Sequence, residues 1–313
     1  MQLHITHTTT YHYVPHVTTA QHMAYLLPRT TPAQQVLATN LFIDPEPGTR
    51  AETQDVYGNV RTFFSLPTPH KELTITAQSL VKTTPCLFDA SDAVDTPAWE
   101  KVRTHFQYHA GAAWDAATEF SFASAFVQPH ADFAHYARAS FTAQRPILQA
   151  AVDLMRRIHS DFDYVSQSTD VHTPAREALA KRQGVCQDFA HILLSCLRTQ
   201  GLSARYVSGY LLTEPPEGQP RLIGSDASHA WVSLYVPDVS DEGLSTQGRW
   251  FDLDPTNDRW GLNAPGADYV CLAWGRDFGD VSPLRGVLHG GANHTLDVAV
   301  TVSPAEVFPT DTD

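Results

Sequence analysis

The sequence predicts an α+β fold, with a helix packed on an antiparallel sheet and an all-β, sandwich-like N-terminal domain before it. Three observations predict this fold. The first 85 residues hold short β-branched runs broken by Pro and Gly, two amphipathic helical patterns follow residue 144, and three strand-like runs follow the second of them. At 313 residues the chain is long enough for about two domains, each with its own core.

The N-terminal domain is predicted to span residues 1–85. Its runs at 11–15 and 72–77 are rich in Thr, Val, Ile, Tyr and Leu, which is typical of the short strands of a sandwich or barrel. Between residues 86 and 143 the chain becomes rich in Ala and aromatic residues, with apolar positions at mixed spacing. We expect short helices there that connect the two domains.

A second domain is predicted over residues 144–303. Apolar residues recur at intervals of three and four from Pro146 to about Ser160, and again from about Gln187 to Gln200, where Gly201 follows as a stop. Runs at 204–212, 230–236 and 250–253 favour an antiparallel sheet beside the second helix. The alternating run 296–302 is expected to add an edge strand to this domain, and residues 304–313 to form a polar tail.

Charge and composition argue against several classes of function. The chain has 21 Lys and Arg against 34 Asp and Glu, which disfavours nucleic acid as a partner. It begins without a basic segment followed by an apolar one, and no run of 18 apolar residues occurs. We therefore expect a cytoplasmic protein with no membrane partner. The four cysteines lack CxxC spacing, which argues against a disulfide framework or a zinc site.

One cysteine stands where a nucleophile would be activated. Cys186 is at the predicted start of the second helix, after Gly184, which is expected to let the backbone turn sharply. The helix dipole and the unpaired amide groups of a first turn favour an anion, so they would stabilise a thiolate at Cys186. The N–H of Cys186 could also donate to a developing oxyanion.

The strands offer a proton carrier and a carboxylate. Residues 230, 232, 234 and 236 form an apolar face, which leaves His229 on the other face at the start of its strand. The next strand brings Asp252 and Asp254, two residues apart and so on one face. Either carboxylate could hold the imidazole in the right tautomer, which gives a Cys-His-Asp arrangement.

Four segments resemble, in order, the motifs of the bacterial transglutaminase-like superfamily. They are Gly-Val-Cys-Gln-Asp-Phe-Ala-His at 184–191, Ala-Arg-Tyr-Val-Ser-Gly-Tyr-Leu at 204–211, Ala-Ser-His-Ala-Trp-Val at 227–232 and Asp-Leu-Asp-Pro-Thr-Asn at 252–257. Residues 12–15 and 25–29 resemble the β-rich domain that precedes the core in these proteins, and Gly-Arg-Asp-Phe at 275–278 resembles a late motif. The resemblance covers most of the chain and is weakest between 86 and 142.

The resemblance implies a papain-like, transglutaminase-like core without cofactor or metal. In it Cys186 attacks an acyl carbon, His229 carries the proton and Asp254 orients His229, with Asp252 as the alternative. Attack on the amide bond of a peptide or protein would leave a thioester on Cys186. Water would then give a protease or amidase, which we favour slightly, whereas an amine would give a transglutaminase. A binding module without chemistry on the same fold is a further alternative.

The remaining candidates have simpler interpretations. The second oxyanion donor is open among Gln183, Gln187 and Tyr164, and the loop 219–226, with Pro215 and Pro216 before it, is expected to shape the acyl site. Asp188 is expected to favour the helix dipole, and Cys196 to be core. His191 is expected to be packed or hydrogen-bonded. Cys86 and Cys271 lack a spacing that would pair them with another ligand or cysteine. Strand alternation is expected to point five N-terminal histidines in different directions, so we do not expect them to bind a metal: His4, His7, His12, His16 and His22.

Overall fold

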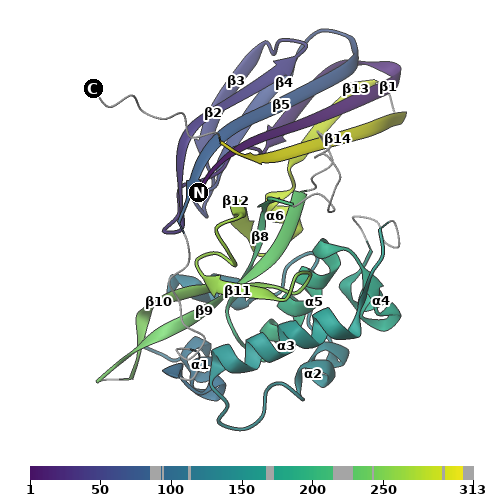
Figure 1. The fold of residues 1–313 in the computed structure, drawn as a ribbon. Helices are drawn as coiled ribbons and strands as arrows, with labels where there is room; N and C mark the ends of the chain where they lie inside the picture. Colours follow the sequence, from purple (N-terminus) through teal and green to yellow (C-terminus); the bar gives the residue numbers. More distant parts are fainter. Residues whose placement is uncertain are drawn as a thin grey trace, which may run out of the picture.

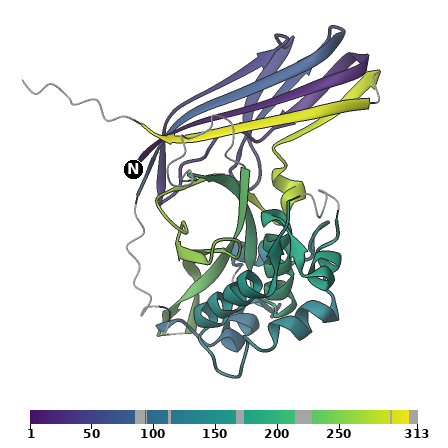
Figure 2. The same ribbon diagram turned by 45° about the vertical axis from the view of Figure 1, so that its right-hand side comes forward.

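The computed structural model describes residues 1–84, 93, 95–111, 114–166, 173–213, 228–241, 243–290 and 293–305. A curved sheet lies across one end of the molecule and the helices lie at the other, with strands of a second sheet between them (Figure 1). The turned view in Figure 2 shows the same three layers. This arrangement confirms the predicted α+β fold with a β-rich N-terminal region.

The N-terminal sheet is built around one very long strand. Its seven strands are β1 (Gln2–Ala24), β2 (Gln34–Asp44), β3 (Thr49–Gln54), β4 (Val60–Leu66), β5 (His70–Thr83), β13 (Leu284–Gly290) and β14 (Asn293–Pro304). The first half of β1 pairs with β5 and β14, and its second half with β4 and β13. The strands alternate apolar and polar residues, as a sheet with one buried face requires.

The sequence favoured a sandwich-like domain, but the described strands of this region form one sheet. Part of its inner face packs on the core of the second domain, and the rest forms a hydrophobic cluster within the N-terminal region itself. Leu3, Ile5 and Val302 belong to the same hydrophobic cluster as the central helix. The last alternating run is an edge strand, as predicted, but of the N-terminal sheet: β14 pairs with β1 from Leu3 to Val14. Sequence alternation shows that a strand has one apolar face and does not show which sheet that face joins.

The second domain packs helices on a five-stranded antiparallel sheet. The helices are α1 (Trp99–Phe106), the 3₁₀ helix η2 (Ala116–Ser121), α2 (Ala131–Ala137), α3 (Ile147–Asp161), α4 (Ala175–Lys181), α5 (Cys186–Thr199) and α6 (Phe278–Val281). The sheet has the order β11-β10-β9-β8-β12, and a small parallel pair joins β6 to β7. These strands are β6 (Asp163–Tyr164), β7 (Gln183–Gly184), β8 (Ala204–Leu211), β9 (Ser228–Ser240), β10 (Gly243–Asp254), β11 (Arg259–Leu262) and β12 (Tyr269–Gly275).

Helix α5 is the centre of this domain because it is buried on almost every side. From Asp188 to Arg198 every residue is buried, and the apolar face of β9 with Ala230, Val232 and Leu234 lies in the same cluster. Trp231 is on the opposite face of β9, as the alternation predicts. The predicted helices correspond to α3 and α5, with Pro146 as the N-cap of α3 and α5 beginning one residue earlier than expected.

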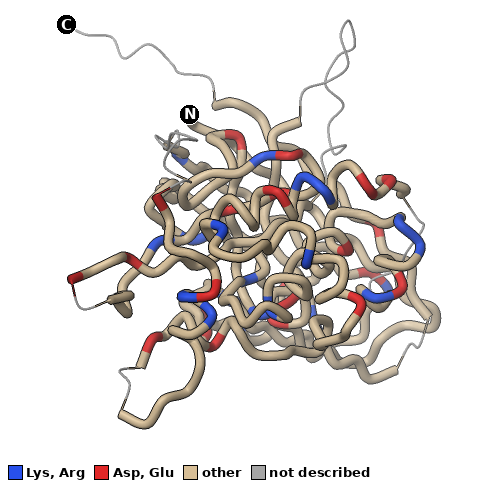
Figure 3. The backbone as a smooth tube through the Cα atoms, turned by 90° about the horizontal axis from the view of Figure 1, so that it is seen from below, with Lys and Arg blue, Asp and Glu red and all other residues tan. Residues whose placement is uncertain are grey.

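Basic and acidic positions are interspersed along the backbone (Figure 3). Within the described residues, no helix combines the length and apolar character that crossing a membrane would require.

Candidate active site

The thiol of Cys186 lies at the first residue of α5, and Asp188 shapes that helix start. The N–H of Val185 donates to Oδ2 of Asp188 over 2.9 Å, so the Asp188 side chain caps the first turn. Gly184 does not adopt a left-handed conformation, so the predicted sharp turn is not its role. Glycine is required at this position because a side chain would not fit: a Cβ on residue 184 would lie 2.7 Å from Cβ of Asp188 and 2.8 Å from its Oδ2.

Antiparallel pairing brings His229 and Asp254 together. His229 is the second residue of β9 and Asp254 is the last of β10, and Leu253 pairs with Val232. The start of one strand therefore meets the end of the next at a single edge of the sheet. Nε2 of His229 lies 2.7 Å from Oδ2 of Asp254, and both side chains are almost fully buried.

His229 is also hydrogen-bonded to the side chain of Cys186. Because Nε2 faces Asp254, Nδ1 is the nitrogen left for the thiol. Burial of the ring lowers the pKa of His229, but the hydrogen bonds and negative charges of Asp254 and Cys186 outweigh it and raise that pKa to about 10. The arrangement can therefore hold an imidazolium between a carboxylate and a thiolate.

Both oxygens of the Asp254 carboxylate accept hydrogen bonds. Oδ2 accepts from the hydroxyl of Tyr269 and from Nδ2 of Asn257, each over 2.7 Å, in addition to His229. Oδ1 accepts from the N–H of Thr256 over 2.8 Å. Burial alone would raise the pKa of Asp254, yet its bonds to His229, Tyr269 and Asn257 lower it. Asp254 is thus an anion held in one orientation.

Asp252 has a different environment. Its Oδ2 accepts from Nε1 of Trp231 over 2.8 Å, and it lies beside the buried Arg205. Burial raises the pKa of this carboxyl. Of the two carboxylates that the sequence left open, the structure places Asp254 on His229.

The other predicted residues are the candidate oxyanion donors, the remaining cysteines and the loop expected to shape the acyl site. Tyr164 is half-exposed, and its partial burial, with smaller contributions from the negative charges of Cys186 and Asp188, raises the pKa of its hydroxyl. Gln183 is exposed and Gln187 is half-buried. Cys196 and Cys271 are buried, and Cys196 is core as predicted. Cys86, Pro215, Pro216 and the loop 219–226 lie outside the described residues.

Three of the four buried histidines in the described residues have a lowered pKa and stay neutral near pH 7. Burial lowers the pKa of each to about 4: His7, His22 and His191. His191 is packed on Phe126 and accepts from the N–H of Phe278 over 3.3 Å, as expected of a structural group. His7 contacts the hydroxyl of Tyr210 over 2.7 Å and so joins β1 to β8.

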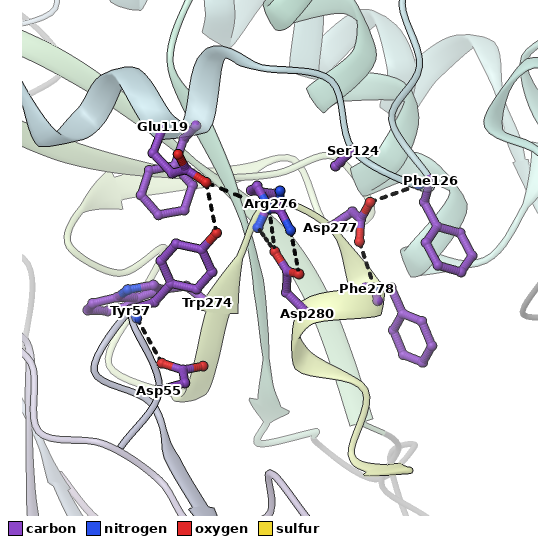
Figure 4. A network of polar contacts seen from close by, with 12 residues as sticks. Asp55, Tyr57, Glu119, Ser124, Phe126, Trp274, Arg276, Asp277, Phe278 and Asp280 are labelled. Atoms are coloured by element: carbon purple, nitrogen blue, oxygen red, sulfur yellow. Dashed lines mark hydrogen bonds and ion pairs between the residues drawn. The ribbon is translucent and has the colours of Figure 1, made fainter. Parts of the chain in front are cut away.

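The late motif 275–278 is hydrogen-bonded to several elements of the second domain. Arg276 donates through Nε to Asp280 over 2.9 Å, and Asp277 caps α6 and accepts from the N–H of Phe126 (Figure 4). Nη2 of Arg198 in α5 donates to the carbonyl of Arg276. The motif therefore joins the end of β12 to the central helix.

Two family models match the chain. A bacterial transglutaminase-like N-terminal region matches residues 3–82, and the transglutaminase-like superfamily matches residues 134–255, a range that contains Cys186, His229 and Asp254. The chain belongs to the transglutaminase-like superfamily. This confirms the resemblance seen in the sequence.

Several proteins resemble this transglutaminase-like chain over nearly its whole length. Uncharacterized proteins of Mycobacterium bovis and Mycobacterium tuberculosis are 40% identical to it over 308 residues, which cover 96% of this chain and 92% of theirs. An uncharacterized protein of Mycobacterium leprae is 30% identical over 306 residues, covering 96% of this chain and 98% of its own. A crystal structure from Cytophaga hutchinsonii, provisionally described as a cysteine protease, has a TM-score of 0.72 at 20% identity and covers 100% of this chain and 94% of its own. It shows the shared fold.

Sequence reasoning did not find Tyr269. It lies in the continuous apolar run of β12, and nothing local relates its hydroxyl to a carboxylate 15 residues earlier. Asn257 was inside a quoted motif, but its bond to Asp254 follows only from the turn after β10.

Proposed function

We propose that this protein is a cysteine hydrolase that cleaves amide bonds in peptides or proteins through a thioester on Cys186. The observation that carries the proposal is the His229 ring, which is hydrogen-bonded to Asp254 on one side and to Cys186 on the other. A thiolate beside an imidazolium that a carboxylate orients is the arrangement expected for acyl transfer.

The reaction would proceed in two halves. The thiolate of Cys186 attacks the carbonyl carbon, and the imidazolium of His229 gives its proton to the leaving nitrogen, so the C–N bond breaks and a thioester and an amine remain. Water then attacks the thioester while His229 takes its proton. The acid leaves, and Cys186 and His229 return to their starting ion pair. Asp254 stays ionised throughout and keeps Nε2 of His229 oriented.

Backbone amides at the start of α5 would stabilise the oxyanion. The first N–H groups of a helix have no acceptor within it and carry the positive end of its dipole. Cys186 is the first residue of α5, so its own N–H lies next to its Sγ. Tyr164 is our candidate for the second donor, because its hydroxyl interacts electrostatically with Cys186.

The first test is mass spectrometry of a peptide library that contains glutamine and lysine side chains, incubated with the wild type or with Cys186→Ala. Peptide cleavage or deamidation with the wild type alone would support a hydrolase. Peptide–amine adducts with release of ammonia would show that the protein is a transglutaminase instead of a hydrolase. The matched control is Cys86→Ala, which removes another of the four cysteines and should leave activity unchanged. Equal products with Cys186→Ala would contradict any role for the Cys186 thioester.

A further inference from the structure

Strand β12 carries Tyr269, and within the described residues it pairs with another strand on one side only. That partner is β8, and the opposite edge of β12 faces the N-terminal sheet. There the amide of Gln34 replaces a strand: Nε2 donates to the carbonyl of Cys271 over 2.7 Å, and the N–H of Cys271 donates to Oε1 over 2.8 Å. Asn59 forms the same pair of bonds with Trp274, over 2.7 and 2.9 Å.

A third side chain of the N-terminal domain, that of Thr83, is hydrogen-bonded to the backbone just before β12. The hydroxyl of Thr83 donates to the carbonyl of Ala267 over 2.5 Å. Tyr269 therefore lies between two anchored positions, Ala267 and Cys271, each two residues away. Both backbone groups that Gln34 satisfies are buried, so leaving them unpaired would be costly.

The ring of Tyr269 is held as well. Arg259 lies over it, 4.8 Å from the ring centre, and Nη2 of Arg259 donates to Asp268 over 2.7 Å. The hydroxyl then reaches Oδ2 of Asp254, the same atom that faces His229. Burial and the charge of Asp254 raise the pKa of Tyr269, so its hydroxyl stays a donor across the working pH range.

We propose that the N-terminal domain is a positioning part of the catalytic centre. Through Thr83 and Gln34 of its sheet, and Asn59 of the loop before β4, it holds β12 so that Tyr269 shares Oδ2 of Asp254 with His229. This sharing limits how strongly His229 holds its proton. The proposal rests on the proposed function, because it treats Cys186 and His229 as the reactive pair. It assigns Tyr269 and the three side chains that hold β12 as positioning residues.

The effect follows from competition at one oxygen. Each donor to Oδ2 neutralises part of the negative charge that attracts the imidazolium. When the Tyr269 hydroxyl is removed, Asp254 binds the His229 proton more tightly, and that proton is given less readily to a leaving nitrogen. We expect Tyr269→Phe to move the alkaline titration of the pair upward by about one pH unit, which is roughly tenfold in proton affinity.

The test measures the rate at which iodoacetamide alkylates Cys186 as a function of pH, by mass spectrometry of the full-length protein, and so needs no substrate. Wild type should give two steps, one for formation of the thiolate–imidazolium pair and one for loss of the His229 proton. Tyr269→Phe should move the second step upward. Thr83→Val, which keeps the shape of the side chain, should move it in the same direction and should add nothing in a Tyr269→Phe background.

Matched controls separate this from general loosening of the fold. Tyr235→Phe removes another tyrosine hydroxyl of the same sheet, one that donates to the carbonyl of Thr246. Thr10→Val removes a threonine hydroxyl that contacts Thr74 inside the N-terminal sheet. Neither should move the second step. If Thr83→Val does not fold, Asn59→Ala takes its place in the same comparison.

Failure of this inference differs from failure of the proposed function. A wild type with a single alkylation step at the pH of an ordinary thiol would remove the ion pair and with it the proposed function. A two-step wild type whose second step is unmoved in Tyr269→Phe, or moved equally in Tyr235→Phe, would overturn the role of Tyr269. Additive shifts in the double variant would overturn the link from the N-terminal sheet to Tyr269.

Discussion

Replacing Asp254 by Asn should separate the charge of this side chain from its shape. Among the described residues, Oδ2 of Asp254 faces three donors, whereas Oδ1 faces the N–H of Thr256 alone. An Asn amide would therefore turn its NH₂ toward Thr256 and keep its carbonyl oxygen toward His229. The variant loses one backbone hydrogen bond, about 1 kcal/mol, and keeps the imidazole contact without the negative charge.

The size of the effect follows from the titration of His229. A pKa raised from 6.5 to about 10 corresponds to roughly 5 kcal/mol in favour of the imidazolium form. Asp254 and Cys186 share this stabilisation, each through a hydrogen bond and a charge. We expect Asp254→Asn to lower the alkaline pKa of the pair by about two units, which by itself roughly halves the protonated fraction of His229 at pH 8. The variant also loses the negative charge that stabilises the imidazolium during the reaction, so we expect amide cleavage at pH 8 to slow by roughly 10³-fold in total.

The assay is the pH profile of kcat/KM on a peptide found by the library experiment, with alkylation of Cys186 as a second readout. Asp252→Asn is the matched control, since that carboxylate binds Trp231 and lies beside Arg205 instead of contacting His229. It should lower thermal stability and leave the alkaline limb in place. An Asp254→Asn profile that coincides with the wild type, or a shift shared by Asp252→Asn, would refute the reasoning.

Three further predictions concern other parts of the molecule. In Gly184→Ala the new Cβ would lie 2.8 Å from Oδ2 of Asp188 and should displace that side chain from the start of α5. We expect the free energy of unfolding to fall by about 1–3 kcal/mol and alkylation of Cys186 to slow. Urea unfolding identical to that of the wild type would contradict this. Burial lowers the pKa of His7, His22 and His191, so these three side chains stabilise the fold above pH 6.5 and lose that contribution as pH falls toward 4. His22→Leu should therefore make the loss of urea stability between pH 6.5 and 4 smaller than in the wild type. An acid loss as large as that of the wild type would count against it. If Tyr164 donates to the oxyanion, Tyr164→Phe should lower kcat by about tenfold or more with little change in KM, measured on the same peptide; a change confined to KM would assign the hydroxyl to substrate binding.

The sequence alone was sufficient for the parts whose physics is local. A cysteine after Gly-Val at the start of an apolar helix predicts its place at the N-terminus of α5, because helix periodicity and stop signals act over a few residues. The alternation of β9 likewise predicts that His229 turns away from the apolar layer. The ordered motifs were enough to indicate the superfamily.

Only the tertiary structure decided between Asp252 and Asp254, because both carboxylates lie on one face of β10 and only the register with β9 brings the second one to His229. It also placed β14 in the N-terminal sheet rather than in the core. Tyr269 depends on it most: its hydroxyl reaches Asp254 through pairing with β8 and through side chains more than 180 residues earlier. Contacts across such separations leave no periodic trace in the sequence, because they are set by how the two sheets pack together.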